Sequence, residues 1–233
     1  MLLIYSFISV IIFSIIFSKN ITKYSKIFYS LAGLISIITI IYETFKMVHG
    51  TKLSGFIYYL EKTSIKGIIS VSFFILVMYA GALSTNYSFT KKLLKMRAEL
   101  AIIASILLLP HGIIYTIKFF LFSFKKVMSN PSGSMAYLGI VITGLIGLIL
   151  MIPLFITSFK KIRRKMSAYS WKKLQKKSYI FYFLTYLHIM IIGIKSMNWI
   201  NISTYSTIFM LYTILRILKY NKDQLKRVKK VAI

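Results

Sequence analysis

Two histidines stand inside strongly apolar runs of this 233-residue sequence, His111 in ILLLPHGIIY and His188 in YFLTYLHIMI. An ionisable side chain at bilayer depth is costly and is therefore a functional candidate. Two imidazoles at matched depth on two helices can bind the iron of one haem from opposite faces. Simple packing, with hydrogen bonds to neighbouring helices, is the alternative, and the pattern alone leaves both open. The third histidine, His49, follows an apolar segment and is interpreted as a solvated loop residue.

Two lysines follow these histidines at a matching interval. Lys118 comes seven residues after His111, and Lys195 comes seven after His188. Seven residues are about two helical turns, so each lysine lies on roughly the same face as its histidine, ~10 Å farther along. The propionates of a buried haem must be neutralised or hydrated, and these lysines, with Tyr115, are placed to meet them. The alternative is that both lysines extend to the membrane interface and contact no cofactor.

The composition defines the environment of these residues. Hydrophobic residues make up 58% of the chain, the mean hydropathy is +0.75, and 31 Lys+Arg stand against 4 Asp+Glu. These values exclude a disordered chain and are not typical of a cytosolic enzyme, while a nucleic-acid partner would need a soluble basic face. The absence of cysteine excludes a thiolate metal site and covalent haem attachment. The sequence therefore predicts an integral membrane protein surrounded by the lipid bilayer.

Seven apolar segments are candidates for membrane-spanning helices, each of which needs about 20 mostly apolar residues. They predict an all-α, polytopic membrane helix bundle, whose first segment is a retained helix rather than a signal peptide. Seven passes would put 23 Lys and Arg on one side and seven on the other. The positive-inside rule then places the C-terminus in the cytoplasm and the N-terminus outside. The segments are Leu2–Phe17, Ile27–Tyr42, Gly67–Leu83, Leu100–Phe122, Met135–Phe159, Tyr179–Ile194 and Thr204–Leu218.

The most basic predicted loop, 160–178, carries nine Lys and Arg together with Trp171. Positive-inside bias and contact with anionic lipids explain such a loop in general. The more specific hypothesis is that a flavin phosphate or a cytosolic electron donor docks at Arg163, Arg164 and Lys165, beside Trp171. No predicted loop is long enough to fold as a soluble domain, and GxGxxG and P-loop motifs are absent. Any chemistry must therefore occur in the bilayer or through a partner, and we assign no catalytic residue.

Several motifs resemble those of the ferric-reductase-like transmembrane family. Their order is also that of the MsrQ-like haem b membrane subunits within it. The resemblance covers about residues 27–219. The motifs are Arg97-Ala-Glu-Leu100 with Pro110-His111 and Tyr115, then Thr157-Ser158, Arg163-Arg164-Lys165-Met166, Trp171-Lys-Lys-Leu174-Gln175, Tyr179 and His188.

This resemblance implies a b-type cytochrome that passes electrons across the membrane. Members of the family often stack two haems, each held by histidines of the same two helices 13 or 14 residues apart. In this sequence the positions of the second pair hold Arg97 and Gln175. Because an amide is a poor iron ligand, we expect one haem b, bound by His111 and His188, with no metal site other than its iron. FMN or a quinone could serve as a further cofactor.

The resemblance also implies an organisation and a function. Residues 1–26 would be an extra N-terminal transmembrane helix and loop, residues 27–219 the six-helix haem-binding domain, and residues 220–233 a basic cytoplasmic tail. We expect electron transport from a quinol or flavin to an extracytoplasmic acceptor, which could be a reductase partner, an FMN-binding protein or ferric iron. Such an oxidoreductase subunit would sit in the inner (cytoplasmic) membrane, with catalysis completed by a partner. A haem-free membrane protein, such as a small transporter or an assembly factor, is the alternative.

Overall fold

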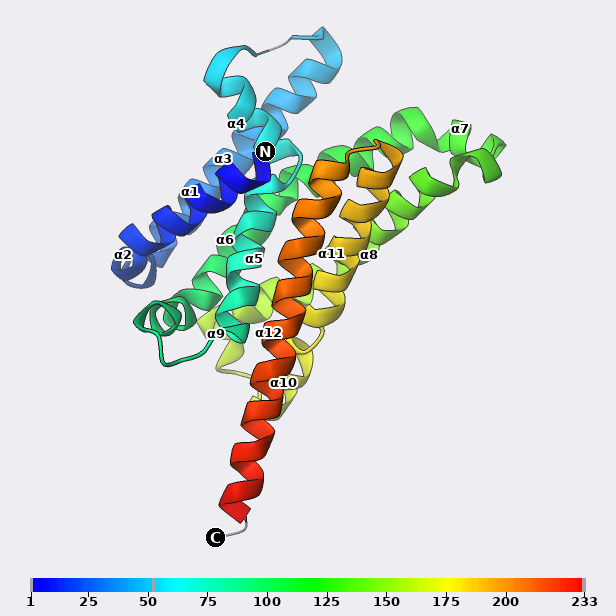
Figure 1. Cartoon of the computed structure of the whole chain (residues 1–233). Coiled ribbons are helices and arrows are strands. Elements are labelled where there is room, and N and C mark those ends of the chain that lie inside the picture. The colour runs from blue at the N-terminus through cyan, green and yellow to red at the C-terminus, as the bar shows by residue number, and fades with distance from the viewer. Residues whose placement is uncertain (1, 52, 232–233) are drawn as a thin grey trace.

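The computed structural model describes residues 2–51 and 53–231, and every regular element within these ranges is a helix (Figure 1). Two short elements, a π-helical turn at Phe119–Ser123 and a 3₁₀ turn at Ser132–Ser134, join α6 to α7 and α7 to α8. The α-helices are α1 (Leu2–Ile16), α2 (Ser18–Lys23), α3 (Ser25–His49), α4 (Gly55–Ile65), α5 (Ile68–Ala82), α6 (Ser88–Lys118), α7 (Phe124–Ser129), α8 (Met135–Ser158), α9 (Lys160–Arg163), α10 (Ala168–Gln175), α11 (Ser178–Lys195) and α12 (Trp199–Val231).

The helices are long and apolar enough for a multi-pass membrane protein. Four continuous stretches meet a length and hydropathy criterion for a span: α3, Ser88–Ser129, α8 and Ala168–Lys195. The pair α4 and α5, bent by 57° at its junction, gives a fifth, and α1 is a shorter apolar helix. All seven predicted segments coincide with helices, so the all-helical, polytopic fold is confirmed. The count of seven spans and the orientation of the termini stay predictions.

Three predicted loops are wrong in part, because helices continue into charged flanks. The stretch 84–99 is already helical from Ser88, because it is rich in Lys, Leu, Met and Ala, which favour helix. Helix α3 runs on to His49, so this histidine ends a helix rather than lying in a loop. The basic loop 160–178 contains α9 and α10. Apolar periodicity alone could not find these extensions, because polar residues at the ends of a span do not have to leave the helix.

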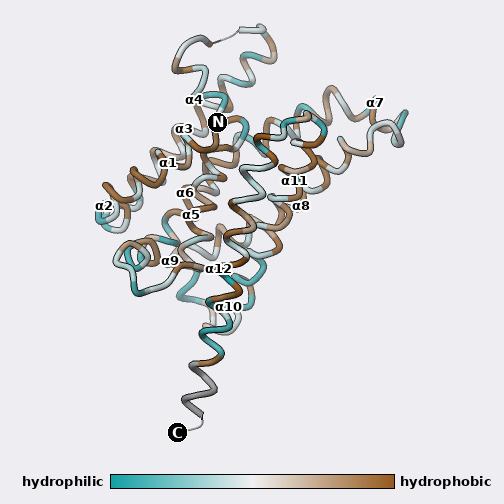
Figure 2. Tube along the Cα trace, viewed as in Figure 1, coloured by the Kyte–Doolittle hydropathy of each residue, from teal (hydrophilic) through white to brown (hydrophobic). Residues whose placement is uncertain are grey.

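The helices run back and forth between two ends of the molecule. In Figure 1, α2, α9, α10 and the C-terminal half of α12 lie toward one end, and α4 and α7 lie toward the other. Figure 2 shows hydrophobic residues along the middle of the bundle, with hydrophilic ones gathered toward its two ends. This arrangement matches alternating passes through an apolar layer.

The core is centred on α5, which packs closely against α6. Helix α5 is apolar on all sides, as expected for a helix enclosed by others, and most of its side chains are buried. Its Ser70 hydroxyl donates to the Ala104 carbonyl of α6 at 2.7 Å. Helix α3 covers another side of α6, and α11 packs against α8.

Pro110, directly before His111, lies inside a helix that continues through it. Proline has no N–H, so the carbonyl of Ile106, four residues earlier, loses its helical donor. The Ser36 hydroxyl of α3 donates to this carbonyl at 2.9 Å. The neighbouring helix therefore satisfies the group that Pro110 leaves free.

The N-terminal helix α1 packs on the outside of α5. The Phe13 ring meets the Phe73 ring edge-on, with centroids 6.2 Å apart, and the Ser72 hydroxyl donates to Ser6 at 3.0 Å. The helix is thus attached by apolar and polar contacts to the element that packs directly on α6.

Candidate functional site

The imidazole rings of His111, on α6, and His188, on α11, lie next to each other. Their ring centroids are 6.1 Å apart and the ring planes are nearly perpendicular, at 85°. Two imidazoles bound to opposite faces of one metal ion, each through a bond of about 2 Å, have centroids roughly 6 Å apart. Two helix positions separated by 77 residues in the sequence thus reach the spacing of a pair of axial ligands.

Each of these rings is held through its Nδ1 atom by a neighbouring backbone carbonyl. His111 Nδ1 lies 2.9 Å from the Ile65 carbonyl oxygen, and His188 Nδ1 lies 2.9 Å from that of Ile140. A carbonyl can only accept, so Nδ1 must carry the hydrogen in both rings. In the neutral imidazole this leaves the lone pair on Nε2, the atom that would bind a metal. The donor set therefore fits bis-histidine ligation.

The carbonyl that holds His111 is free because α4 ends there. Ile65 is the last residue of α4, where a helix leaves its carbonyls without intrahelical donors. The chain then turns at Gly67, whose φ of +68° favours glycine. A Cβ at Gly67 would lie 3.4 Å from His111 Cγ, so the bend between α4 and α5 closes directly on the ring.

Helix α8 holds His188 in a similar way. The Thr143 Oγ1 atom lies 3.2 Å from His188 Nδ1, and the Thr143 hydroxyl itself donates to the Gly139 carbonyl at 2.6 Å. A Cβ at Gly144 would come within 3.1 Å of His188 Cε1, closer than ordinary contact. A glycine at this position therefore gives the imidazole its room.

The C-terminal ends of α3, α4 and α6 hold an ion-pair cluster that sequence reasoning missed. Lys118 Nζ lies 2.8 Å from a carboxylate oxygen of Glu43. Lys46 Nζ bridges the other oxygen of Glu43 at 3.0 Å and Glu61 at 2.9 Å. Glu43 is 1% exposed, so these cations offset the cost of burying its charge. The scarcity of acids in the sequence was the available signal, because two of only four lie here.

The predicted propionate-facing residues are only partly brought together. The Tyr115 ring lies beside His111, with centroids 4.8 Å apart, and Lys118 lies 5.7 Å from the Tyr115 ring centroid. Together with the ion-pair cluster they line a cavity of about 350 Å³. Lys195 does not line this cavity. It is exposed, and its Nζ lies 4.9 Å from the Tyr137 ring centroid.

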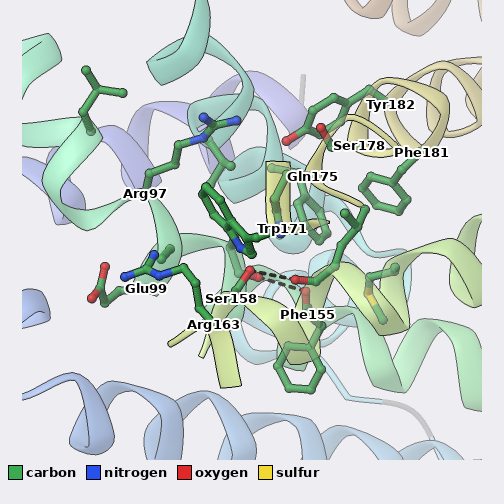
Figure 3. Close-up of a pocket in the computed structure, with 18 of the residues that line it drawn as sticks. Arg97, Glu99, Phe155, Ser158, Arg163, Trp171, Gln175, Ser178, Phe181 and Tyr182 are labelled. Atoms are coloured by element: carbon green, nitrogen blue, oxygen red, sulfur yellow. Dashed lines mark hydrogen bonds between the residues drawn. The ribbon is translucent and has the colours of Figure 1, made fainter. Parts of the chain in front are cut away.

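A second cavity, of about 380 Å³, lies in the half of the bundle next to α9 and α10 (Figure 3). Its walls include Arg97 and Gln175, the two residues at the positions of a second histidine pair. Gln175 Nε2 donates to Thr157 Oγ1 at 3.2 Å, and Trp171 Nε1 donates to the Thr157 carbonyl at 3.3 Å. These bonds fasten α10 to the end of α8.

The structure separates the four residues that the sequence suggested for docking a flavin or an electron donor. Arg163 and Trp171 both line the second cavity, with the guanidinium carbon 5.6 Å from the indole centroid. Arg164 and Lys165 are exposed and do not line it. His49 is also exposed, and its ring packs on Phe45 with centroids 4.2 Å apart.

Comparisons with known proteins agree with this architecture. Residues 66–186, about half of the chain, match the family described as ferric reductase like transmembrane component. An uncharacterized protein of Treponema pallidum (strain Nichols) is 28% identical over 156 residues, which cover 64% of this chain and 42% of that protein. The chain thus spans less than half the length of this relative. No solved structure matches.

Proposed function

Since the chain belongs to the ferric reductase like transmembrane component family, we propose that it is a haem b electron-transfer subunit, with one haem between His111 and His188. The observation that supports this proposal is the pair of neighbouring imidazoles, with ring centroids 6.1 Å apart and each Nδ1 bonded to a backbone carbonyl. A bound haem supplies a one-electron carrier whose potential depends on its axial ligands and burial.

Backbone and side-chain groups of this protein would orient that carrier. The Ile65 and Ile140 carbonyls fix the tautomer and the direction of each ring, so that little reorganisation accompanies ligation. Tyr115 packs on His111, and Lys118 offers a cation at the outer end of α6. An ammonium has three donors, so Lys118 can keep its bond to Glu43 and still meet an anionic group.

The finer assignments belong to the same proposal. The electron donor would be a quinol or a flavin, and the acceptor an extracytoplasmic reductase, an FMN-binding protein or ferric iron, as in an MsrQ-like subunit. The protein would lie in the inner (cytoplasmic) membrane, with the basic loops in the cytoplasm. The excess of Lys and Arg on α2, α9, α10 and the C-terminal part of α12 supports this orientation.

Absorption spectra of purified variants test the proposal. We expect the wild-type protein to show a b-type Soret band that shifts on reduction with dithionite. His111→Ala and His188→Ala should each remove the bis-histidine spectrum, because one axial ligand is lost. His49→Ala is the matched control, since that ring is exposed at the end of α3. Haem loss in the His49→Ala variant, or retention of the spectrum in both other variants, would contradict the ligand assignment.

A further inference from the structure

We propose that the cavity at Arg97 and Gln175 binds the ring of a quinol, and that Glu99 accepts the protons of this quinol when it is oxidised. This inference rests on the proposed function, because the electrons need a carrier to leave the cavity. It assigns the electron donor a chemical class, a place in the fold and a proton acceptor.

The cavity has the composition of a small-molecule site. Its volume of about 380 Å³ lies at the low end of the range typical of ligand pockets, which are mostly apolar with a few convergent polar groups. In Figure 3, Trp171 and Gln175 lie between Arg97 and Glu99 on one side and Phe181 and Tyr182 on the other. Further apolar wall comes from α5, with Phe74 and Val77, and from α8, with Met151, Leu154 and Phe155.

A carboxylate oxygen without a partner points to the kind of ligand. Glu99 lines the cavity and is 3% exposed. Its Oε1 atom lies 3.5 Å from Lys160 Nζ, whereas its Oε2 atom is buried and accepts no hydrogen bond in the described part of the chain. A buried acceptor left unpaired is costly, so a ligand that donates a hydrogen bond is favoured here. A quinol hydroxyl is such a donor.

The groups around Glu99 suit both redox forms of this ligand. Arg97 and Gln175 carry N–H donors that can bond to a quinone carbonyl, while Glu99 can accept from a quinol hydroxyl. The ring would lie against the aromatic side chains of Trp171 and Phe181. A quinol is dissolved in the bilayer, and this cavity lies between helices of the bundle. A flavin nucleotide fits less well, because its phosphate and ribityl chain must be accommodated as well as its ring.

The cavity is close enough to the histidine pair for electrons to pass from a bound quinol to a haem at that pair. Ser105 and Phe181 line the cavity, six and seven residues before His111 and His188 on their helices. At 1.5 Å per residue these intervals are about 9–11 Å. Both helices therefore connect the two sites by roughly two turns.

The reaction balances with the ferric haem of the proposed function as the oxidant. One quinol loses two electrons singly, and both of its O–H bonds break. The first electron reduces the ferric iron to ferrous, the extracytoplasmic acceptor of the proposed function takes that electron, and the second electron reduces the same iron again. The two protons pass in turn to the Glu99 carboxylate and from there to water beside the exposed Lys160. A quinone remains, and its carbonyl oxygens accept hydrogen bonds from Arg97 and Gln175.

Fluorescence of Trp171 gives a direct test. The chain has two tryptophans, so Trp199→Phe leaves Trp171 as the single reporter in the cavity wall. The full-length protein in lipid nanodiscs is titrated with 2,3-dimethyl-1,4-naphthoquinone, which should quench the emission saturably at micromolar concentrations. Ser105→Phe, which fills the cavity, should weaken binding at least tenfold. Gln175→Leu is a second variant that removes a donor without adding bulk, and it should weaken binding severalfold.

The role of Glu99 is tested with the reduced ligand under anaerobic conditions. Glu99→Gln should bind the naphthoquinol at least fivefold more weakly, because the amide has lost the negative charge and one of the two acceptor oxygens. It should bind the naphthoquinone no worse, because its NH2 group adds a donor for a quinone carbonyl. Asp223→Asn, an acid-to-amide change at an exposed position of α12, is the control and should leave both affinities unchanged. Equal loss of both forms in Glu99→Gln, or no loss of either, would overturn the role of Glu99.

Three outcomes would overturn the cavity assignment itself. These are linear, unsaturable quenching, unchanged affinity in both Ser105→Phe and Gln175→Leu, and saturable binding of riboflavin without binding of the naphthoquinone. The titration is repeated in a His111→Ala background, which separates it from the haem proposal. Persisting affinity there, with no haem, is expected. A wild-type protein without haem that still binds the naphthoquinone would reject the proposed function and leave the quinone site standing.

Discussion

Two levels of the bundle, each with one residue from α6, hold different chemistry. In the half nearer α4, which is the outer half in the proposed orientation, the ring centroids of His111 and His188 are 6.1 Å apart, and each Nδ1 is bonded to a backbone carbonyl. In the inner half, Arg97 and Gln175 border a cavity of about 380 Å³. Helices α6 and α11 therefore bring two imidazoles together at one level, whereas α6 and α10 border an open, polar-edged space at the other. Under the proposed function, one level holds a haem and the other holds a smaller molecule.

The outer half also differs in how its charge is arranged. Lys118 and Lys46 are paired with the buried Glu43, so that the charges of cations and carboxylates offset each other beside the two histidines. At the inner cavity, Glu99 has Lys160 at 3.5 Å from one carboxylate oxygen, and its other oxygen has no hydrogen-bond partner among the described residues. A closed ion-pair network stabilises its surroundings, whereas an unsatisfied acceptor is poised to bind a donor.

The largest effect is expected from a substitution that displaces the His188 ring. Gly144→Leu places side-chain atoms where a Cβ alone would lie 3.1 Å from His188 Cε1, so the ring must leave its position. We expect haem content to fall at least fivefold, measured as the pyridine haemochrome. Gly147→Leu is the control on the same helix, because nothing lies within 4 Å of its added Cβ. An equal loss in both variants would attribute the effect to helix packing instead.

The next prediction removes the difference between the halves. The double variant Arg97→His/Gln175→His places imidazoles at both inner positions, one on α6 and one at the end of α10, shortly before α11 begins. We expect the haem content to rise from about one toward two per chain, with a second midpoint potential in a redox titration. Quenching of Trp171 by the naphthoquinone should disappear at the same time. A ratio that stays at one, with quinone binding intact, would show that the inner cavity cannot accommodate a macrocycle.

The sequence predicted the helices and the histidine pair, because both depend on local apolar runs and on matched depth along two helices. It could not predict the carbonyl partners of the imidazoles, since these arise where α4 happens to end and where α8 packs on α11. The pairing of Lys118 with Glu43 joins residues 75 positions apart and has no local signature. The inner cavity could not be predicted either, because the absence of a histidine from the sequence does not show whether a cavity lies at that position.

A smaller effect distinguishes the two lysines that the sequence treated alike. Lys118 borders the cavity beside Tyr115, whereas Lys195 is exposed over Tyr137. Lys118→Ala should increase the rate of haem loss to apomyoglobin severalfold, because it removes a cation near the haem and leaves Glu43 with one fewer partner. Lys195→Ala should change that rate less than twofold. Equal effects of the two substitutions would support the prediction from the sequence, in which both lysines have the same role.

The smallest effect concerns the second acceptor of His188. Thr143→Val removes the hydroxyl at 3.2 Å but leaves the Ile140 carbonyl at 2.9 Å, so the ring keeps its tautomer. We expect haem affinity to fall less than about tenfold, the lower limit typical of lost outer-shell partners. A redox titration and a haem-transfer assay measure the change. Complete loss of haem would mean that Thr143 rather than the carbonyl orients the imidazole.

The haem-to-chain ratio of the purified wild-type protein tests the central claim most directly. It combines the pyridine haemochrome with quantitative amino-acid analysis of a monodisperse sample reconstituted with haemin. A ratio near one, with the reduced spectrum of a six-coordinate b-type cytochrome, is the predicted result. A folded protein that stays colourless after reconstitution, or a ratio near two, would contradict it.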